Sequence, residues 1–264
     1  MEVETYAQIQ RTIKKVLGID LTHYKAQQMY RRLDTWLLRS NVPTWEAYLT
    51  RLRMDPAEQA RFRDYLTINV SSFFRDPDRW KSLQKDILPR LLVETFGRRF
   101  GGELRLWSAG CSIGAEPYTL AIMLAEMARG RQAYLLATDL DRGALAKARA
   151  GGPFSEEDVQ QLSQTQKNTY LTEAPPYFVR PSLSRRVTFR EQNLLSDPFE
   201  SDFDLIVCRN VLIYFNPDAK NALFSRFYEA LRPRGVLFLG GSEIIAFPHQ
   251  FGFRTCGPSF YEKV

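Results

Sequence analysis

Two residue types that support many enzyme reactions are scarce in this sequence. It contains three cysteines and two histidines among 264 residues. Cys111, Cys208 and Cys256 are too scattered for a disulfide framework, and no Cys/His pair has the spacing of metal ligands. We therefore expect reduced thiols and no metal. His23 and His249 lie far apart in the chain, so we expect them to be surface or packing residues rather than catalytic ones.

Long apolar stretches are also missing. No run approaches the roughly 20 apolar residues that cross a bilayer. The start, MEVETYAQIQ, has neither the basic segment nor the apolar core of a signal peptide. Hydrophobic residues still make up 44% of the chain, enough for one large or two small domains. The sequence predicts a cytoplasmic globular protein without membrane insertion, and we expect a monomer.

Acidic residues are outnumbered by basic ones. The formal net charge of +6 predicts attraction to an acidic partner, but charge alone does not choose among nucleic acid, an anionic membrane and an acidic protein face. Lys25, Arg32 and Arg39 repeat every seven residues along the flank of an expected helix, which is either a solvated flank or a docking surface for an acidic partner. The apolar face of this helix is expected to hold Ala26, Met29, Tyr30, Leu33, Trp36 and Leu37.

The periodicity of apolar residues divides the chain. Residues 3 to about 96 have helical spacing, and from about 103 short apolar strands alternate with helices. Strands separated by helices of ten or more residues are typical of a doubly wound α/β fold with a parallel sheet. We predict a helical N-terminal domain at 1–68, a linker with a connecting helix at 69–102, and an α/β domain at 103–264.

Three local features refine this division. Asp76 and Pro77 are typical of an N-cap followed by the first residue of a helix, and Pro89 should break or kink that helix. The segment 151–192 interrupts the strand and helix alternation. Within it, Tyr177 to Arg180 and Val187 to Arg190 are predicted to form two strands of a small hairpin insertion.

The first strand of the α/β domain ends in SAGCSIGAEP, a run of small residues followed by an acid. In doubly wound sheets, ligands bind beyond the carboxyl ends of the strands. The dinucleotide fingerprint G-x-G-x-x-G is absent, and Glu116 at the start of a helix would repel a pyrophosphate but suit a cation. The alternative is a tightly packed turn in which Glu116 complements the helix dipole.

Later strand ends add two polar candidates. Asp139 is the first acid after the next apolar strand, where it can accept hydrogen bonds from ribose hydroxyls, while Asp141 should cap the following helix. Asn210 follows a fourth strand and offers both a donor and an acceptor to a ligand, or caps a turn. A ribose-binding acid, a second carboxylate for a cation and no phosphate loop favour S-adenosylmethionine over NAD.

The sequence resembles a known family in six segments that occur in the family's order. They are SSFFRD, SAGCSIGAEPY, ATDLDRGALAKARAG, NLL, CRNVLIYF and GVLFLGGSE. The set is similar to the chemotaxis receptor glutamate methyltransferases of the CheR type and spans essentially the whole chain. This resemblance implies methyl transfer from S-adenosylmethionine to receptor glutamates, giving a methyl ester and S-adenosylhomocysteine. It also implies a Rossmann-like core with a helical N-terminal domain and a small antiparallel insertion.

The resemblance also implies site residues at matching positions. Arg75 and Tyr214 correspond to the residues beside the reacting methyl group. The implied cofactor-binding residues are Asn69, Ser71, Arg75, Glu116, Asp139, Asn193, Leu194, Asn210 and Val211. The implied partner is the acidic, helical methylation region of a chemoreceptor. A glutamate has an unperturbed pKa of about 4.3, so the nucleophile is already ionised at neutral pH and needs no general base.

Two positions depart from the family's pattern. Ala115 stands where many members have a second acid before Glu116. In some members a hairpin with a glycine grips a tether peptide at the receptor's C-terminus, whereas RPSLSRR has no glycine, which counts against tether binding.

Two other functions compete with this interpretation. One is methylation of nucleic acid, which the basic charge favours, but RNVLIYF lacks the prolines common at the fourth strand of amino-methylating enzymes. The other is a non-catalytic adaptor that binds the cofactor or a receptor. For want of those prolines we do not expect nucleic acid as the partner. Because the phosphate loop is absent, we do not expect a NAD-linked oxidoreductase either.

Overall fold

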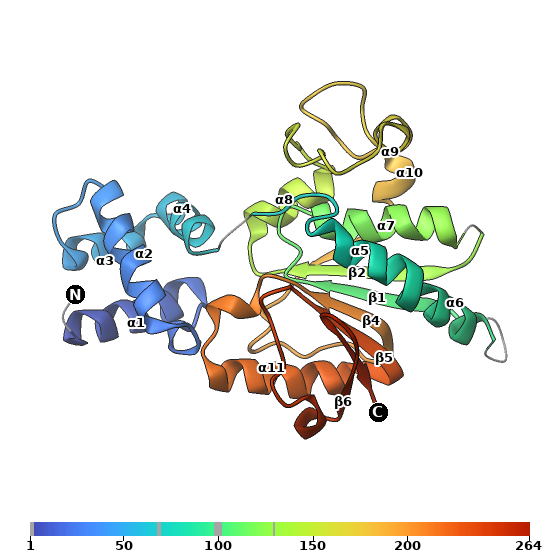
Figure 1. The fold of residues 1–264 in the computed structure, drawn as a ribbon. Helices are drawn as coiled ribbons and strands as arrows, with labels where there is room; N and C mark the ends of the chain where they lie inside the picture. Colours follow the sequence, from blue (N-terminus) through green and yellow to red (C-terminus); the bar gives the residue numbers. More distant parts are fainter. Residues whose placement is uncertain (1–2, 68–69, 98–101, 129) are drawn as a thin grey trace. The chain divides into compact units, whose positions relative to one another are not determined.

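The computed structural model describes residues 3–67, 70–97, 102–128 and 130–264. The chain divides into two units, Met1–Ile68 with Ile213–Ala222, and Asn69–Leu212 with Leu223–Val264. Figure 1 follows the chain through both units. None of the described helices is long and apolar enough to cross a membrane.

The N-terminal unit is helical, as predicted. Thr44 caps α3 by accepting a hydrogen bond from the backbone N of Ala47, and Asp55 caps α4 in the same way. Phe62 and Tyr48 are fully buried between these helices, with ring centroids 5.4 Å apart. The helices are α1 (Val3–Leu17), α2 (Ala26–Arg39), α3 (Trp45–Met54) and α4 (Pro56–Leu66), with a short 3₁₀ helix at Leu21–His23.

The amphipathic character predicted for residues 22–40 is confirmed in α2. Met29, Leu33 and Trp36 are buried. Ala26 was also predicted on the apolar face, but it is exposed because it is the first residue of the helix and precedes the turns that are packed. Arg32 is partly buried against its own unit, since its guanidinium stacks 4.8 Å from the Tyr65 ring and donates a hydrogen bond to the Tyr65 carbonyl.

The second unit contains a seven-stranded sheet in the order β3-β2-β1-β4-β5-β7-β6. The pairs among β3, β2, β1, β4 and β5 are parallel, and β7 and β6 add antiparallel strands at one edge. The parallel strands confirm the predicted doubly wound core, while the two antiparallel strands were not predicted. The strands are β1 (Leu104–Ala109), β2 (Ala133–Asp139), β3 (Val187–Glu191), β4 (Phe203–Cys208), β5 (Leu231–Leu239), β6 (Phe253–Gly257) and β7 (Phe260–Lys263).

Aromatic and aliphatic side chains pack on both faces of this sheet. On one face, Trp80 and Tyr118 are buried in a cluster with residues of six strands. On the other, Trp107 packs against Phe227, with ring centroids 5.7 Å apart. The helices of this unit are α5 (Pro77–Ser82), α6 (Leu88–Phe96), α7 (Ala115–Met127), α8 (Arg142–Ala150), α9 (Gln164–Tyr170) and α10 (Pro181–Ser184), together with the second half of α11 (Pro217–Ala230).

The helical segment after Pro77 is interrupted near Pro89, as predicted. Leu83–Ile87 forms a π-helical turn between α5 and α6, and Pro89 lies in the first turn of α6. Because proline lacks the backbone N–H, the regular helical hydrogen-bond pattern cannot continue through it.

The insertion differs from the predicted hairpin. Val187–Glu191 is β3, which pairs in parallel with β2 in the main sheet. Tyr177 instead forms an antiparallel bridge to Phe154, and Val179 forms one to Leu171. The predicted pairing failed because the Pro181–Ser184 segment is a short helix, which directs the chain onward to the sheet rather than back on itself.

Candidate functional site

The strand order places the candidate site at the carboxyl edge of the sheet. β1 has β2 on one side and β4 on the other, so the chain order reverses at β1. Ligands of doubly wound folds bind at such a reversal, in the crevice formed by the loops that follow the two strands. The segment after β1 and the segment after β4 are therefore the ones to compare with the predicted residues.

Glycines bring the loop after β1 against neighbouring elements. Gly110 has φ +84°, and a Cβ there would lie 2.5 Å from Cγ2 of Val211, which follows β4. Gly114 has φ +96°, and its Cβ would lie 3.0 Å from the Cβ of Ala148 in α8. Both positions combine a left-handed backbone with close packing, so only glycine fits without strain. The small residues therefore do form a tight turn. In this turn Gly110 packs against the side chain of Val211.

Asp139 closes β2 and binds this same loop. Its carboxylate accepts hydrogen bonds from the backbone N of Ser112, at 2.7 Å, and of Asp141, at 2.9 Å. Burial raises the pKa of Asp139, against the effect of these backbone donors. Asp141 caps α8 by accepting from the N of Ala144 at 3.0 Å, as predicted. The neighbouring acids thus have different surroundings, and Asp139 is the one fixed at the strand end.

Glu116 lies in the first turn of α7. Its Oε1 accepts a hydrogen bond from Oγ of Ser108 at 2.8 Å, and its Oε2 is 4.0 Å from Nη1 of Arg209. Burial raises the pKa of Glu116 to about 7, and the charge of Glu243 adds to this effect, while Arg209, Ser108 and Arg75 oppose it. A bound cation would favour the ionised carboxylate, so this position suits a positively charged group.

The segment after β4 carries Asn210 and Val211. Asn210 has φ 60°, and its backbone N donates to Oε2 of Glu243 at 2.7 Å. The same oxygen accepts from the N of Gly240 at 2.8 Å. Glu243 therefore ties the end of β4 to the end of β5. Glu243 was not among the predicted site residues, although its segment, GVLFLGGSE, is one of those that carry the resemblance.

Asn193 and Leu194 follow β3 and lie in a turn with fixed backbone. Oδ1 of Asn193 accepts from the N of Leu195 at 3.0 Å, and the N of Asn193 donates to Oδ2 of Asp197 at 2.8 Å. Leu194 is buried, and its carbonyl accepts a hydrogen bond from the guanidinium of Arg226. Both predicted residues thus sit in an ordered loop at the carboxyl end of an edge strand.

The segment before α5 presents Arg75. Phe73 is fully buried against Phe154, with ring centroids 4.9 Å apart, and the N of Phe74 donates to Oγ1 of Thr119 at 3.1 Å. The Arg75 side chain is half-buried, and its Nη1 donates to the carbonyl of Val70 at 2.9 Å. Among the described residues, no carboxylate forms an ion pair with Arg75. Its sequence neighbours Asp76 and Asp78 instead bind Arg209 and Lys81.

Asp76 occupies the N-cap position of α5 but does not cap it. Its backbone is left-handed, with φ 58°, and its side chain makes no capping hydrogen bond. Its carboxylate instead accepts from Nη2 of Arg209 at 2.7 Å. The prediction that this carboxylate caps the helix is wrong, because a charged hydrogen bond to arginine is stronger than one to a backbone N–H.

Three further residues complete the predicted set. Ser71 is half-buried in the segment before Arg75. Asn69 lies outside the described residues. Tyr214 belongs to the helical unit, at the end of a 3₁₀ helix (Leu212–Tyr214), and its carbonyl accepts from the N of Lys25 at 3.0 Å.

Arg209 is a functional candidate that the sequence analysis missed. Its side chain is 2% exposed and approaches both Asp76 and Glu116. Burial lowers its pKa, which the two carboxylates oppose. The signal was present in CRNVLIYF, where a charged residue directly follows an apolar strand, but Asn210 and Val211 were the site residues predicted there.

The donor set fits S-adenosylmethionine. Asp139 offers a carboxylate at the position typical of ribose binding, and Glu116 offers another where a cation is favoured. The helix start that would hold a pyrophosphate carries Glu116 instead. The site therefore suits a nucleoside with a positively charged tail better than a dinucleotide.

Comparison with known proteins agrees with this fit. The family described as CheR methyltransferase, SAM binding domain, matches residues 69–259, and its all-alpha domain matches residues 4–67. A chemotaxis protein methyltransferase of Listeria monocytogenes is 40% identical over 98% of this chain and 97% of its own. The chemotaxis protein methyltransferase Cher2 of Pseudomonas putida is 31% identical over 96% of this chain and 95% of its own.

Both matched domains and both near-full-length relatives point to one family, and the description of the domain matched at residues 69–259 names the cofactor. The chain belongs to the CheR family: it is a chemotaxis protein methyltransferase, a protein-glutamate O-methyltransferase that uses S-adenosylmethionine.

Proposed function

We propose that the chain methylates glutamates in the acidic, helical methylation region of chemoreceptors, and that it works as a cytoplasmic monomer. The observation that carries the proposal is that the site contains both a cation that can bind a carboxylate and a buried acid that can bind a cation. Arg75 forms no ion pair with a carboxylate of the described residues, while Glu116 lies in a position that favours a cation. The Arg75 guanidinium suits a substrate carboxylate, and the Glu116 carboxylate suits the amino group of the cofactor.

The proposed division of labour follows from these charges. S-adenosylmethionine supplies a methyl carbon bonded to a positively charged sulfur, which leaves with the bonding electron pair when a carboxylate oxygen attacks. Asp139 accepts hydrogen bonds from the ribose hydroxyls, Glu116 faces the amino group, and Asn193, Leu194, Asn210 and Val211 line the nucleoside. Asn69 and Ser71 complete the cofactor site in this proposal.

Arg75 and Tyr214 are proposed to orient the receptor glutamate. The planar guanidinium of Arg75 can hold a carboxylate in its fork, and the Tyr214 hydroxyl can donate a weaker hydrogen bond. No proton has to be removed, since the glutamate is ionised at neutral pH. Alignment of the two reacting groups alone can lower a barrier by about 7 to 11 kcal/mol, so positioning is the main task of these side chains.

The docking surface is proposed to include Lys25 and Arg39. Lys25 occupies the N-cap position of α2 and Arg39 is its last residue, both on the predicted basic flank, and an acidic receptor helix has the complementary charge. Arg32 lies on the same flank, but its guanidinium donates a hydrogen bond to the Tyr65 carbonyl, whereas Arg39 only approaches the Tyr65 ring, at 5.9 Å. We therefore assign Arg32 to the structure of the helical unit and the steering role to the other two.

The decisive experiment uses S-adenosylmethionine labelled in its methyl group. The protein is incubated with cytoplasmic fragments of chemoreceptors, and the washed product is treated with mild base. A glutamate methyl ester releases the label as methanol, whereas N-methyl groups stay bound. A matched receptor fragment with glutamine in place of the candidate glutamates serves as the control. Base-stable label, or equal labelling of the control, contradicts the proposal.

A further inference from the structure

Arg209 connects two parts of the site that lie far apart in the sequence. Its Nη2 donates to the carbonyl of Arg75 at 2.9 Å and to Oδ2 of Asp76 at 2.7 Å. Its Nη1 faces the other way, 4.0 Å from Oε2 of Glu116. The guanidinium carbon lies over the rings of Trp80, at 5.2 Å, and Phe238, at 5.0 Å. The side chain is thus held in one orientation between the Arg75 segment and the start of α7.

We propose that Arg209 is a positioning residue for methyl transfer. With one half of its guanidinium it fixes the peptide that carries Arg75, and with the other half it presents a positive charge to Glu116. This inference rests on the proposed function, in which Arg75 meets the substrate carboxylate and Glu116 meets the amino group of the cofactor. It adds one side chain that acts both on the residue that binds the substrate and on the residue that binds the cofactor.

The backbone around Arg75 shows why such an anchor is needed. Phe74 and Asp76 have φ values of 50° and 58°, in the left-handed region that residues other than glycine rarely adopt. Backbone of this kind persists where surrounding contacts hold it. Trp80 and Arg209 supply two of these contacts, because Nε1 of Trp80 and Nη2 of Arg209 each donate to the Arg75 carbonyl at 2.9 Å. Arg209 is the charged one of the two.

The surroundings of Glu116 show the second role. The charged and titratable groups that act on it or feel its charge are Arg209, Arg75, Glu243, Cys111 and Cys208. Arg209 is the largest of the influences that lower the pKa of Glu116, which burial and Glu243 raise. Without this cation, more of Glu116 would be protonated at neutral pH, and a neutral carboxyl group attracts an ammonium weakly.

The geometry calls for arginine rather than lysine. A guanidinium presents donors in two directions from one rigid plane, whereas an ammonium is a compact charge on a flexible stem. Arg209→Lys should therefore keep most of the charge effect on Glu116 but lose the fixed link to the Arg75 carbonyl. Arg209→Gln should lose both. Asp76→Asn should weaken the link to the Arg75 segment alone, and asparagine tolerates the left-handed backbone at that position.

The first measurement is the affinity for S-adenosylhomocysteine as a function of pH, by calorimetry. The series stays between about pH 5.5 and 7.5, below the pKa of roughly 8 of an α-amino group. Affinity of the wild type should rise with pH as Glu116 ionises, with a midpoint near its pKa of about 7. In Arg209→Gln the midpoint should move to higher pH, and a move of about one pH unit would lower the affinity below the midpoint by about tenfold. Methylthioadenosine, which lacks the amino-acid end, should bind without this pH dependence in either protein.

The second measurement is the rate of receptor methylation under saturating cofactor and receptor. Arg209→Lys and Asp76→Asn should lower kcat by about 10- to 100-fold, since small misplacements of a reacting group are costly, while their pH midpoints stay near that of the wild type. Arg209→Gln should shift the pH midpoint of binding, whereas Arg209→Lys and Asp76→Asn should lower kcat without shifting it. Loss of folding would not separate these two effects. Circular dichroism and thermal unfolding verify that the variants are folded.

The outcomes separate the inference from the function on which it rests. If the wild type neither binds S-adenosylhomocysteine nor methylates receptors, the proposed function fails. If the wild type does both, but Arg209→Gln keeps the wild-type pH profile or Asp76→Asn and Arg209→Lys keep full kcat, the inference alone is overturned. Should Arg209→Gln not fold, Arg209→Lys and Asp76→Asn decide the case through kcat and the unchanged midpoint.

Discussion

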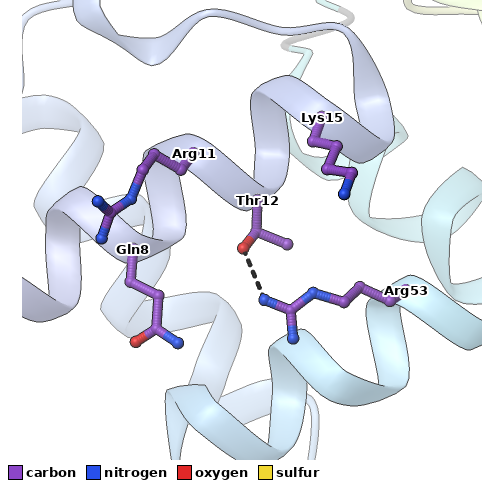
Figure 2. Close-up of a pocket in the computed structure, with 5 residues that line it drawn as sticks. All are labelled: Gln8, Arg11, Thr12, Lys15 and Arg53. Carbon is purple, nitrogen blue, oxygen red and sulfur yellow. Dashed lines mark hydrogen bonds between the residues drawn. The ribbon is translucent and has the colours of Figure 1, made fainter.

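Arg209 at the carboxyl edge of the sheet is buried, whereas the cations around a cavity of the helical unit are exposed. At the edge, Arg209 is 2% exposed and contacts defined partners on two elements. On the helical unit, Arg11, Lys15 and Arg53 are exposed around a cavity of about 400 Å³ between α1 and α3 (Figure 2). The described lining of that cavity has three cationic side chains and no acidic one.

This difference separates two uses of charge. A buried charge is weakly screened and must be matched by neighbours, so changing it alters one step of the reaction strongly. An exposed charge is screened by salt and adds to the field of its neighbours, so changing it alters association modestly. We therefore expect large, residue-specific effects from the sheet edge and small, salt-dependent effects from the helical unit.

The largest effect is expected from Arg75. Arg75→Ala removes the cation proposed to orient the substrate carboxylate, so kcat at saturating receptor should fall by about 10²- to 10³-fold, the range seen when an oriented electrostatic contact is lost. Arg75→Lys is the matched control, which keeps the charge without the fork and should recover part of the loss. Tyr214→Phe should cost less, since it removes a neutral hydrogen bond. Full rates in both Arg75→Ala and Tyr214→Phe would rule out this assignment.

The next effect concerns the acid at the end of β2. Asp139→Ala should weaken binding of S-adenosylhomocysteine by about 10- to 100-fold, because a hydrogen bond to a charged group contributes roughly 1.5 to 3 kcal/mol. Asp141→Ala, two residues later, removes the N-cap of α8 and should cost about 1 kcal/mol of stability with little change in affinity. Calorimetric titration and chemical denaturation measure the two effects separately. Equal loss of affinity in both variants would contradict the role of Asp139.

Glu58 tests whether burial or location decides the effect of a charge. It is a buried acid of the helical unit, with 1% side-chain exposure, and accepts from Arg51 and Arg61 at 2.9 Å and from the Tyr48 hydroxyl at 3.0 Å. Glu58→Ala leaves these donors without their acceptor, and because both arginines reach solvent the cost in unfolding free energy should be about 1 to 3 kcal/mol.

The same variant should leave the cofactor site unchanged. Urea denaturation of Glu58→Ala should show the lowered stability, and Glu58→Gln, which keeps a polar acceptor, should be intermediate. Affinity for S-adenosylhomocysteine should equal that of the wild type in both. A loss of affinity comparable to that of Asp139→Ala would show that the contrast between the two units does not hold.

Local patterns in the sequence predict the parallel core well. The predicted alternation of strands and helices is seen in LRLWSA, which forms β1, AYLLATD, which forms β2, and RGALAKARA, which forms α8. Apolar runs, acids at strand ends and caps are all local signals. Strand pairing is not local, which is why Val187–Glu191 was assigned to a hairpin instead of the sheet edge. The antiparallel strands β6 and β7 were missed for the same reason, since they are short and are defined by pairing with each other and with β5.

The candidate site divides in the same way. Asp139 and Glu116 could be predicted because each follows or begins an element whose bounds are visible in the sequence. Arg209 could not, because its role depends on Asp76 and Arg75, more than 130 residues earlier in the chain. Asp76 was assigned to the adjacent helix for want of this distant partner. Contacts between buried charges are thus the part of the site that only the three-dimensional structure supplies.

The smallest effect is expected from two surface cations of the helical unit, the half-buried Lys25 and the exposed Arg39. Reversing Lys25 and Arg39 to glutamate should raise KM for a receptor fragment by about three- to tenfold and change kcat by less than twofold, because electrostatic steering acts on association more than on the bound state. Added salt should reduce the difference from the wild type, since exposed charges are screened within roughly 10 Å at 0.1 M.

Reversing Arg11 and Lys15 instead is the matched control for this last prediction. It changes the net charge of the same unit by the same amount, but at the cavity between α1 and α3 rather than on the flank of α2. If the flank of α2 docks the receptor, the control should raise KM less than the first pair does. Equal increases would mean that net charge, not the flank, steers the receptor, and an unchanged KM in the first pair would remove α2 from the docking surface. The ratio of the two KM values therefore measures how far an exposed charge acts through its position.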